Sequence, residues 1–286
     1  MLEFSQRPAI LLALLALLII VIPLKRWIHK IILLNTPLNV WEKDVIYHEI
    51  PLLKILTAKQ KRKLEGKINL FLNQIDFLGC NGVEVTDHMR LLIAAQACLL
   101  IVNTKGLWYD TLRTVLIYPS AFQSTEIEDD GLIVSEYNSV RVGESWYRGP
   151  VILSWSDSKT GTYIGNDGRN VVIHEFAHQL DAQTGSTNGM PLLKKGHSSK
   201  DWESVFIQAY NKLIDDIDNE NETTLDTYAA TNPAEFFAVS VETFFEKPNF
   251  LKKHNPNLYN QLATFFELDP ASYQLNIESN ITHNLN

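Results

Sequence analysis

Two histidines and a glutamate stand close enough together in this chain to bind and use a metal ion. Residues 174–178 read His174-Glu175-Phe-Ala-His178. On a helix, positions four apart lie on one face, so both imidazoles can point at one zinc ion. At about 100° per residue, Glu175 lies beside that ion, where a general base for a metal-activated water belongs. The spacing predicts a catalytic zinc site, with a purely structural pair of histidines as the alternative.

A catalytic zinc also needs a third protein ligand and one open position. Residue 184 is a threonine, so the spacing that supplies a third histidine six residues after His178 is absent. A glutamate from a downstream helix is the other common solution. Glu235 and Glu242 both qualify, because they are seven residues apart and share one face of a helix predicted over 232–246. Glu235 also lies in Asn232-Pro233-Ala234-Glu235, which resembles a capping box, so the spacing leaves both glutamates open.

Two further residues are candidates for supporting roles at this site. Asp181 lies one turn beyond His178 and could accept the second ring N–H of a ligand histidine, which would fix its tautomer. The alternative for Asp181 is a solvated acid at a helix end. Tyr228 lies seven residues before Glu235, and its hydroxyl could stabilise an oxyanion. The alternative for Tyr228 is a packing residue on an amphipathic segment.

The elements that must position these residues can be predicted from apolar periodicity and end signals. Asn170 is a good N-cap for a helix over 171–182, and Gly185 is a good stop. Further helices are predicted over 57–77, 86–102, 202–217, 232–246 and 256–266, short strands over 114–118, 132–134 and 151–155, and a turn-rich segment over 161–169. Helices around a few central strands indicate the α+β class.

The strand predicted over 151–155 suggests how a substrate could bind. If this strand lies at the edge of the sheet, an extended peptide can pair with it as an additional strand. We therefore predict that Ile152, Leu153 and Ser154 contact the substrate.

Composition narrows the function classes. The chain has 286 residues, is 45% hydrophobic and carries a formal charge of −8. Residues 1–30 carry +3, which leaves −11 on the remainder and argues against direct nucleic-acid binding. Cys80 and Cys98 form no Cys-x-x-Cys pair, so we expect free thiols and no thiolate zinc site.

The N-terminus differs from the rest of the chain. Residues 9–24 are an unbroken apolar run, followed by Lys25, Arg26 and Lys30. This pattern predicts a membrane anchor over 1–30, rather than a signal peptide or a core helix. The positive charge after the run predicts a single-pass inner-membrane protein whose catalytic domain faces the cytoplasm, with a cytoplasmic protein as the alternative. The remaining divisions are then a linker over 31–50, a metallopeptidase domain over 51–272 and a C-terminal tail over 273–286.

Several long stretches resemble the MtfA-like zinc metallopeptidases, also called glucose-regulated metallopeptidases. They are EVTDHMRLLIAAQAC (84–98), VLIYP (115–119), GESW (143–146), GPVILSW (149–155), NVVIHEFAHQLD (170–181) and DTYAATNPAEFFAV (226–239). The resemblance extends from about residue 52 to 270. An apolar N-terminus is a departure, because soluble members of the family lack it.

The resemblance implies more than the spacing does. It implies a mainly helical, zincin-like metallopeptidase domain with a small sheet, here preceded by a hydrophobic helix. Glu235 matches the third ligand of a single Zn²⁺ ion, and Tyr228 matches a tyrosine near the metal. The implied activity is peptide-bond hydrolysis on peptide or protein substrates, aminopeptidase-like on small ones, with a transcription repressor as an expected partner. The alternative is a membrane-tethered regulatory protein that sequesters such a partner, with catalysis secondary.

Overall fold

The computed structural model describes residues 7–104, 106–120, 122–129, 134–141, 143–145, 149–194 and 196–273 of the chain. Side chains are described for residues 19–104, 106–120, 149–194 and 196–273. The C-terminal tail predicted over 273–286 lies outside the described residues apart from Tyr273.

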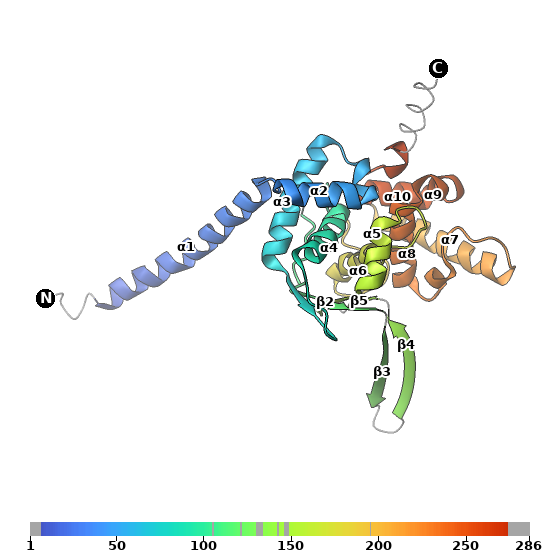
Figure 1. Ribbon diagram of the computed structural model, residues 1–286, viewed down its shortest axis with the longest axis horizontal. Helices are drawn as coiled ribbons and strands as arrows, with labels where there is room; N and C mark the ends of the chain where they lie inside the picture. The colour runs from blue at the N-terminus through green and yellow to red at the C-terminus, as the bar shows by residue number, and fades with distance from the viewer. Residues whose placement is uncertain are drawn as a thin grey trace, which may run out of the picture.

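A small sheet lies on one side of the body (Figure 1). Strands β1 (Asp76–Gly79), β2 (Thr114–Tyr118) and β6 (Val151–Ser154) are parallel, and β5 (Gly143–Ser145) pairs antiparallel with β6, in the order β1-β2-β6-β5. Val115 and Ile117 of β2 are fully buried while their neighbours are partly exposed, as expected for the alternation of a strand. The strands predicted over 114–118 and 151–155 are confirmed.

A separate antiparallel hairpin of β3 (Phe122–Asp129) and β4 (Val134–Arg141) projects from the body (Figure 1). The strand predicted over 132–134 falls largely outside the described residues, and Val134 is the first residue of β4.

Helices make up most of the described chain, which confirms a mainly helical α+β fold. They are α1 (Arg7–Asn35), α2 (Val40–Glu49), α3 (Ala58–Gln74), α4 (Asp87–Leu100), α5 (Trp155–Tyr163), α6 (Val171–Asp181), α7 (Ser199–Asp218), α8 (Pro233–Glu246), α9 (Pro248–His254) and α10 (Pro256–Phe266), with short 3-10 helices η1 (Pro51–Ile55), η2 (Ala182–Thr184) and η3 (Thr227–Ala230). The helices predicted around α3, α4, α6, α7, α8 and α10 are confirmed to within a few residues.

The core forms around α4, α6 and α8. Helix α4 is buried on all sides from Leu91 to Leu100, which explains why its sequence is apolar around the whole helix. Helix α6 packs against α4, α8 and the strands β5 and β6, so it lies at the centre of the domain. A central helix of this kind holds its side chains in place because its backbone has contacts on several sides.

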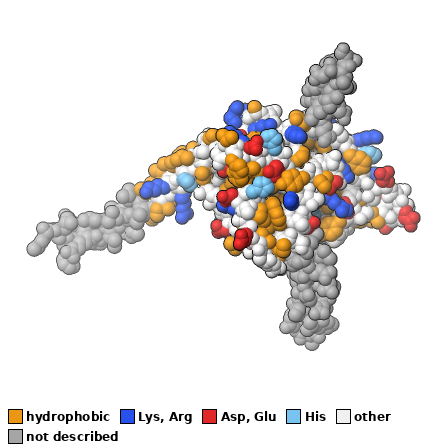
Figure 2. All heavy atoms as spheres, in the orientation of Figure 1, with side chains coloured by type: hydrophobic (Ala, Val, Ile, Leu, Met, Phe, Trp, Pro, Cys, Tyr) orange, Lys and Arg blue, Asp and Glu red, His pale blue; other side chains and the backbone are white. Residues whose placement is uncertain are grey.

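The N-terminal helix α1 leaves the body as a long extension (Figure 1). The membrane-anchor prediction is wrong: no helix within the described part of the chain is long and apolar enough to cross a membrane. Lys25, Arg26 and Lys30 end the apolar run of α1, and Figure 2 shows basic side chains among the exposed apolar ones. The predicted single-pass inner-membrane location is therefore withdrawn.

The end of α1 joins the domain through α3. A Cβ added to Gly66 of α3 would lie 2.0 Å from the carbonyl oxygen of Leu34, so only glycine allows this close crossing. The segment predicted as a linker over 31–50 contains this crossing and all of α2, in which Val45 and Ile46 are buried. These contacts make the segment part of the packed body.

Helix α5 shows where local sequence was a poor guide. The turn-rich segment predicted over 161–169 begins inside α5, whose sequence is rich in Ser, Thr and Gly. Ser154 caps α5 by accepting a hydrogen bond from the amide of Asp157, and Thr162 accepts one from the buried amide of Gln96 on α4. A local cap and a tertiary hydrogen bond therefore support a helix that propensity alone disfavours. Cys80 and Cys98 are free thiols, as expected.

Candidate metal centre

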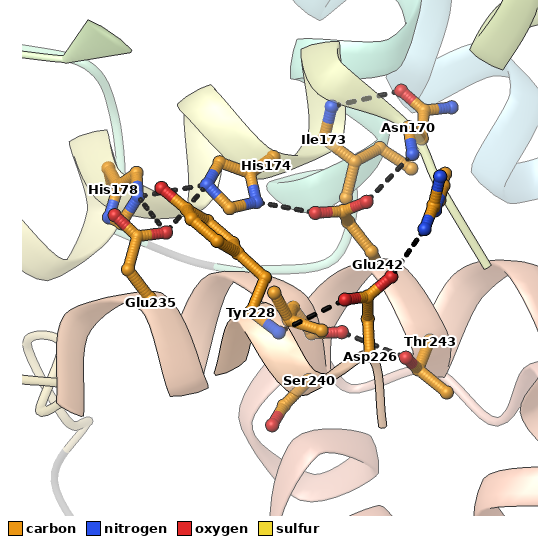
Figure 3. Close-up of polar contacts among 12 residues, drawn as sticks. Asn170, Ile173, His174, His178, Asp226, Tyr228, Glu235, Ser240, Glu242 and Thr243 are labelled. Atoms are coloured by element: carbon orange, nitrogen blue, oxygen red, sulfur yellow. Dashed lines mark hydrogen bonds and ion pairs between the residues drawn. The ribbon is translucent and has the colours of Figure 1, made fainter. Parts of the chain in front are cut away.

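Helix α6 brings His174, Glu175 and His178 to one side of the domain core. Asn170 caps the helix, because its Oδ1 accepts a hydrogen bond from the amide of Ile173 at 3.1 Å. Five apolar residues of α6 are fully buried, namely Val172, Ile173, Phe176, Ala177 and Leu180. This buried face fixes the rotation of the helix, so that the two histidine rings face α8 (Figure 3).

Helix α8 supplies a carboxylate opposite the histidines. Asn232 caps α8 by accepting from the amide of Glu235 at 3.0 Å. Glu235 turns its own carboxylate to the imidazoles (Figure 3). Its Oε2 lies 3.0 Å from His174 Nε2 and 3.4 Å from His178 Nε2. The carboxylate of Glu235 therefore faces the histidines and does not complete the capping box that the sequence suggested.

The three groups fit a metal ion. One ligand atom from each of His174, His178 and Glu235 lies within 4.8 Å of the other two. The Nε2 atoms of the histidines are 3.1 Å apart, and the buried Oε2 of Glu235 has no well-aligned hydrogen-bond donor among the described residues. Burial alone would raise the pKa of Glu235, but the adjacent imidazoles hold it well below its ordinary value, so the carboxylate is anionic. Two imidazole nitrogens and one carboxylate oxygen are a donor set typical of catalytic zinc, with a fourth position left for water.

Glu175 lies beside this cluster and is only 2% exposed. Its Oε2 has no hydrogen-bond partner in the described part of the chain. Burial raises the pKa of Glu175 to about 8, and the nearby carboxylates of Glu235 and Glu242 add to this effect while His174 opposes it. A buried carboxyl group whose pKa lies close to neutrality is suited to accept a proton and then return it.

Tyr228 lies next to the ring of His174. It lies in η3, where Asp226 accepts a hydrogen bond from its amide at 3.0 Å. Its ring centroid is 6.1 Å from that of His174, and its hydroxyl points towards Glu235 and His178 (Figure 3). Tyr228 is 54% exposed, and its partial burial, together with the carboxylate of Glu235, raises its pKa to about 12. Its hydroxyl therefore keeps its proton and can donate a hydrogen bond.

Asp181 does not occupy the position predicted for it. Its Oδ2 accepts a hydrogen bond from the amide of Gly189 at 2.8 Å, so it holds a loop and not a histidine ring. The Nδ1 atom of His174 is instead hydrogen-bonded to Glu242. Asp181 lies one helical turn after His178 and faces the loop at Gly189. Glu242 lies on α8 and faces the ring of His174. The spacing of Glu242 from Glu235 was the signal that could have revealed this role.

The predicted substrate strand also differs from the structure. Ile152 and Leu153 of β6 pair with β2 on one side and with β5 on the other, so this strand has no free edge there for a substrate. Ser154 pairs with Tyr118 and its hydroxyl caps α5. Strand addition at β6 is therefore excluded, since its backbone groups are already paired.

A cleft of about 550 Å³ opens beside the cluster. His174, Glu175, Tyr228 and Glu242 line it. Its outer wall also contains Asp157, Asp167, Asp226 and Arg169, of which Arg169 and Asp226 form an ion pair at 2.7 Å. Carboxylates outnumber cations in this wall, so the cleft favours a positively charged group on a ligand.

Comparison with known proteins agrees with this chemistry. The family model described as glucose-regulated metallo-peptidase M90 matches residues 24–267. An uncharacterized protein, slr2042, from Synechocystis sp. is 42% identical over 240 residues, which cover 83% of this chain and 87% of that protein. Mlc titration factor A from Klebsiella pneumoniae is 36% identical over 234 residues (80% and 86%), and that from Salmonella arizonae is 37% identical over 226 residues (78% and 89%).

Proposed function

The chain belongs to the glucose-regulated metallopeptidase family M90, and we propose that it is a zinc-dependent peptidase with a zincin-like site. His174, His178 and Glu235 are the proposed ligands of one Zn²⁺ ion per chain. The observation that carries the proposal is the approach of their three ligand atoms to one another beside Glu175, whose Oε2 has no hydrogen-bond partner in the described part of the chain. When bound, zinc would make a water molecule acidic near neutral pH and polarise the carbonyl of the substrate.

The proposed catalytic steps on the protein side are proton transfer and charge stabilisation. Glu175 takes the proton of the attacking water and gives it to the leaving amine when the peptide bond breaks. Burial suits Glu175 to this task because it brings the pKa of the carboxyl group close to the working pH. Tyr228 donates its hydroxyl proton in a hydrogen bond to the carbonyl oxygen as negative charge develops there.

The proposed specificity is aminopeptidase-like. Asp157 and Asp167 line the cleft, and no ion pair between either carboxylate and a cation is found among the described residues. Such carboxylates would attract the protonated amino terminus of a peptide. The test is a comparison of free and N-acetylated versions of the same small aminoacyl reporter, of which only the free one should be cleaved efficiently.

The zinc site itself is tested by metal content and turnover together. We expect one zinc per chain in the native protein and in Glu246→Gln, a control that removes a buried carboxylate from the same helix. Glu235→Ala should lose both the zinc and the hydrolysis of the reporter. Full zinc content in Glu235→Ala would refute the ligand assignment. A zinc-loaded native protein that cleaves nothing in a broad peptide panel would refute the peptidase activity.

The names of the relatives support a second candidate function. Mlc titration factor A is named for titrating Mlc, and this chain shares most of its length with two such proteins. A regulatory role, in which the chain binds a comparable repressor, would survive the loss of catalysis. Glu175→Gln separates the two functions, because it should retain zinc but not turnover. A cellular effect that persists in this variant would favour the binding role.

A further inference from the structure

Glu242 contacts His174, a proposed metal ligand, at Nδ1, the ring nitrogen that does not face Glu235 and His178. It lies on α8 seven residues after Glu235, so both carboxylates leave the same face of the helix, two turns apart. Glu235 faces the Nε2 atoms of the histidines, whereas Glu242 is hydrogen-bonded to Nδ1 of His174 (Figure 3). Glu242 is only 7% exposed, so this contact is largely shielded from water.

The second oxygen of Glu242 is also engaged. Oε2 accepts a hydrogen bond from the backbone amide of Asn170 at 2.8 Å, and Asn170 is the residue that caps α6. Glu242 therefore connects α8 both to the N-cap residue of α6 and to the His174 ring carried by α6. With both oxygens occupied, Glu242 is not placed to serve as a third ligand.

The direction of the hydrogen bond determines which nitrogen of His174 can bind a metal. A carboxylate only accepts hydrogen bonds, so Nδ1 of His174 carries the proton. A neutral imidazole has one N–H and one nitrogen with a free lone pair. With the proton on Nδ1, the lone pair that can bind a metal is on Nε2. This is the atom that lies 3.1 Å from Nε2 of His178 and 3.0 Å from Oε2 of Glu235.

We propose that Glu242 is the positioning residue of the metal centre, which holds His174 in the tautomer and ring orientation that direct Nε2 to zinc. This inference rests on the proposed zinc site and goes beyond it, because it assigns a role to a residue that does not contact the metal. Partners of this kind typically change metal affinity by ~10–100-fold when they are removed.

Helix α8 offers a matched control. Glu246 lies one turn after Glu242 and is 1% exposed. It joins the same network, because its Oε1 accepts a hydrogen bond from the side-chain amide of Asn170 at 3.2 Å. Glu242 and Glu246 therefore share burial, helix and a partner, and they differ in the contact with His174.

The decisive experiment measures zinc affinity by competition with a chelating indicator for native protein, Glu242→Gln and Glu246→Gln. In Glu242, His174 Nδ1 and the amide of Asn170 face different oxygens. Glutamine at 242 replaces one of these oxygens with an NH2 group that only donates, so one of the two contacts is lost. We expect Glu242→Gln to bind zinc ~10–100-fold more weakly and to show an altered visible spectrum with cobalt, while Glu246→Gln stays close to native. Equal affinities for a folded Glu242→Gln and the native protein would overturn the inference.

A second measurement needs no variant and so does not depend on one folding. In the zinc-loaded native protein, nitrogen-15 NMR should show a proton on Nδ1 of His174 and zinc on Nε2, and zinc on Nδ1 would overturn the inference. Failure of the proposed peptidase function would give a different result from failure of the inference about Glu242. The protein would then bind zinc with the predicted dependence on Glu242 and yet cleave no peptide.

Discussion

Glu246 should make the stability of the domain depend on pH. Its side chain is 1% exposed, its Oε1 accepts one hydrogen bond from Asn170, and its Oε2 has no partner among the described residues. Burial is the main cause that raises the pKa of Glu246, from 4.5 to about 8, and the nearby carboxylates Asp167 and Glu242 add to it. The folded state therefore holds the Glu246 proton more tightly than the unfolded chain does.

The sign and size of the effect follow from this difference. Below pH 4.5 the group is protonated in both states, and its contribution to the free energy of unfolding is fully present. Between pH 4.5 and about 8 the unfolded chain loses the proton while the folded state retains it, so stability falls as pH rises. At about 1.4 kcal/mol per pH unit, the window corresponds to at most ~5 kcal/mol. Glutamine keeps the shape and the acceptor oxygen and does not ionise.

The assay is urea unfolding of metal-free native protein and Glu246→Gln in the presence of a chelator. At about pH 5 we expect similar free energies of unfolding, and at about pH 9 we expect the variant to be more stable by ~2–5 kcal/mol. Because Glu175 and Asp181 are present in both proteins, their titration cancels in the difference. A difference that stays constant across the pH range would refute the reasoning about Glu246.

Four further predictions concern the site and its supports. Glu175→Gln should retain zinc and lose ~10²–10⁴-fold in kcat, as measured by elemental analysis and reporter hydrolysis. Tyr228→Phe should lower kcat by ~10²-fold with little change in KM, and an unchanged kcat would remove Tyr228 from the mechanism. Arg169→Ala breaks an ion pair whose arginine side chain is 77% exposed, so the free energy of unfolding should change by less than about 1 kcal/mol. Because Asp226, the partner of Arg169, also accepts a hydrogen bond from the Tyr228 amide, Arg169→Ala should lower kcat, and this decrease should disappear in a Tyr228→Phe background. Gly189→Ala should destabilise by about 1–3 kcal/mol more than Gly196→Ala in urea unfolding, because both have positive φ but only at Gly189 would the new Cβ lie 2.5 Å from the carbonyl oxygen of Pro233.

The His-Glu-x-x-His motif and its helix were predictable because they depend on local spacing. Residues four apart on a helix share a face, whatever the rest of the fold, and Asn170 marks the start of that helix. Strands β2 and β6 were predictable in the same way, since short apolar runs ended by proline or a capping serine leave few alternatives. Helix α5 was not predicted, because its hydrogen bonds to α4 and to its cap are tertiary or side-chain contacts that propensity does not count.

Two of the mistaken predictions required knowledge of neighbouring elements, and the membrane anchor did not. The apolar run over 9–24 suggested an anchor, but no helix in the described part of the chain is long and apolar enough to span a membrane. Whether β6 has a free edge depends on β5, which lies in a separate stretch of sequence. Asp181 was a plausible partner of a histidine from its spacing, but in the structure its carboxylate accepts a hydrogen bond from the amide of Gly189.

The sequence by itself determined the chemistry that is available: two histidines and a glutamate on one helix, and two glutamates on one face of another. Helical spacing could not assign the tasks of Glu235 and Glu242, because it places both on the same side of one helix, and only the family resemblance matched Glu235 to a ligand. The tertiary structure distinguishes the two glutamates through the packing of α8 against α6. That packing sets Glu235 opposite the Nε2 atoms of the histidines and Glu242 behind the ring of His174, so equivalent carboxylates differ only in what faces them.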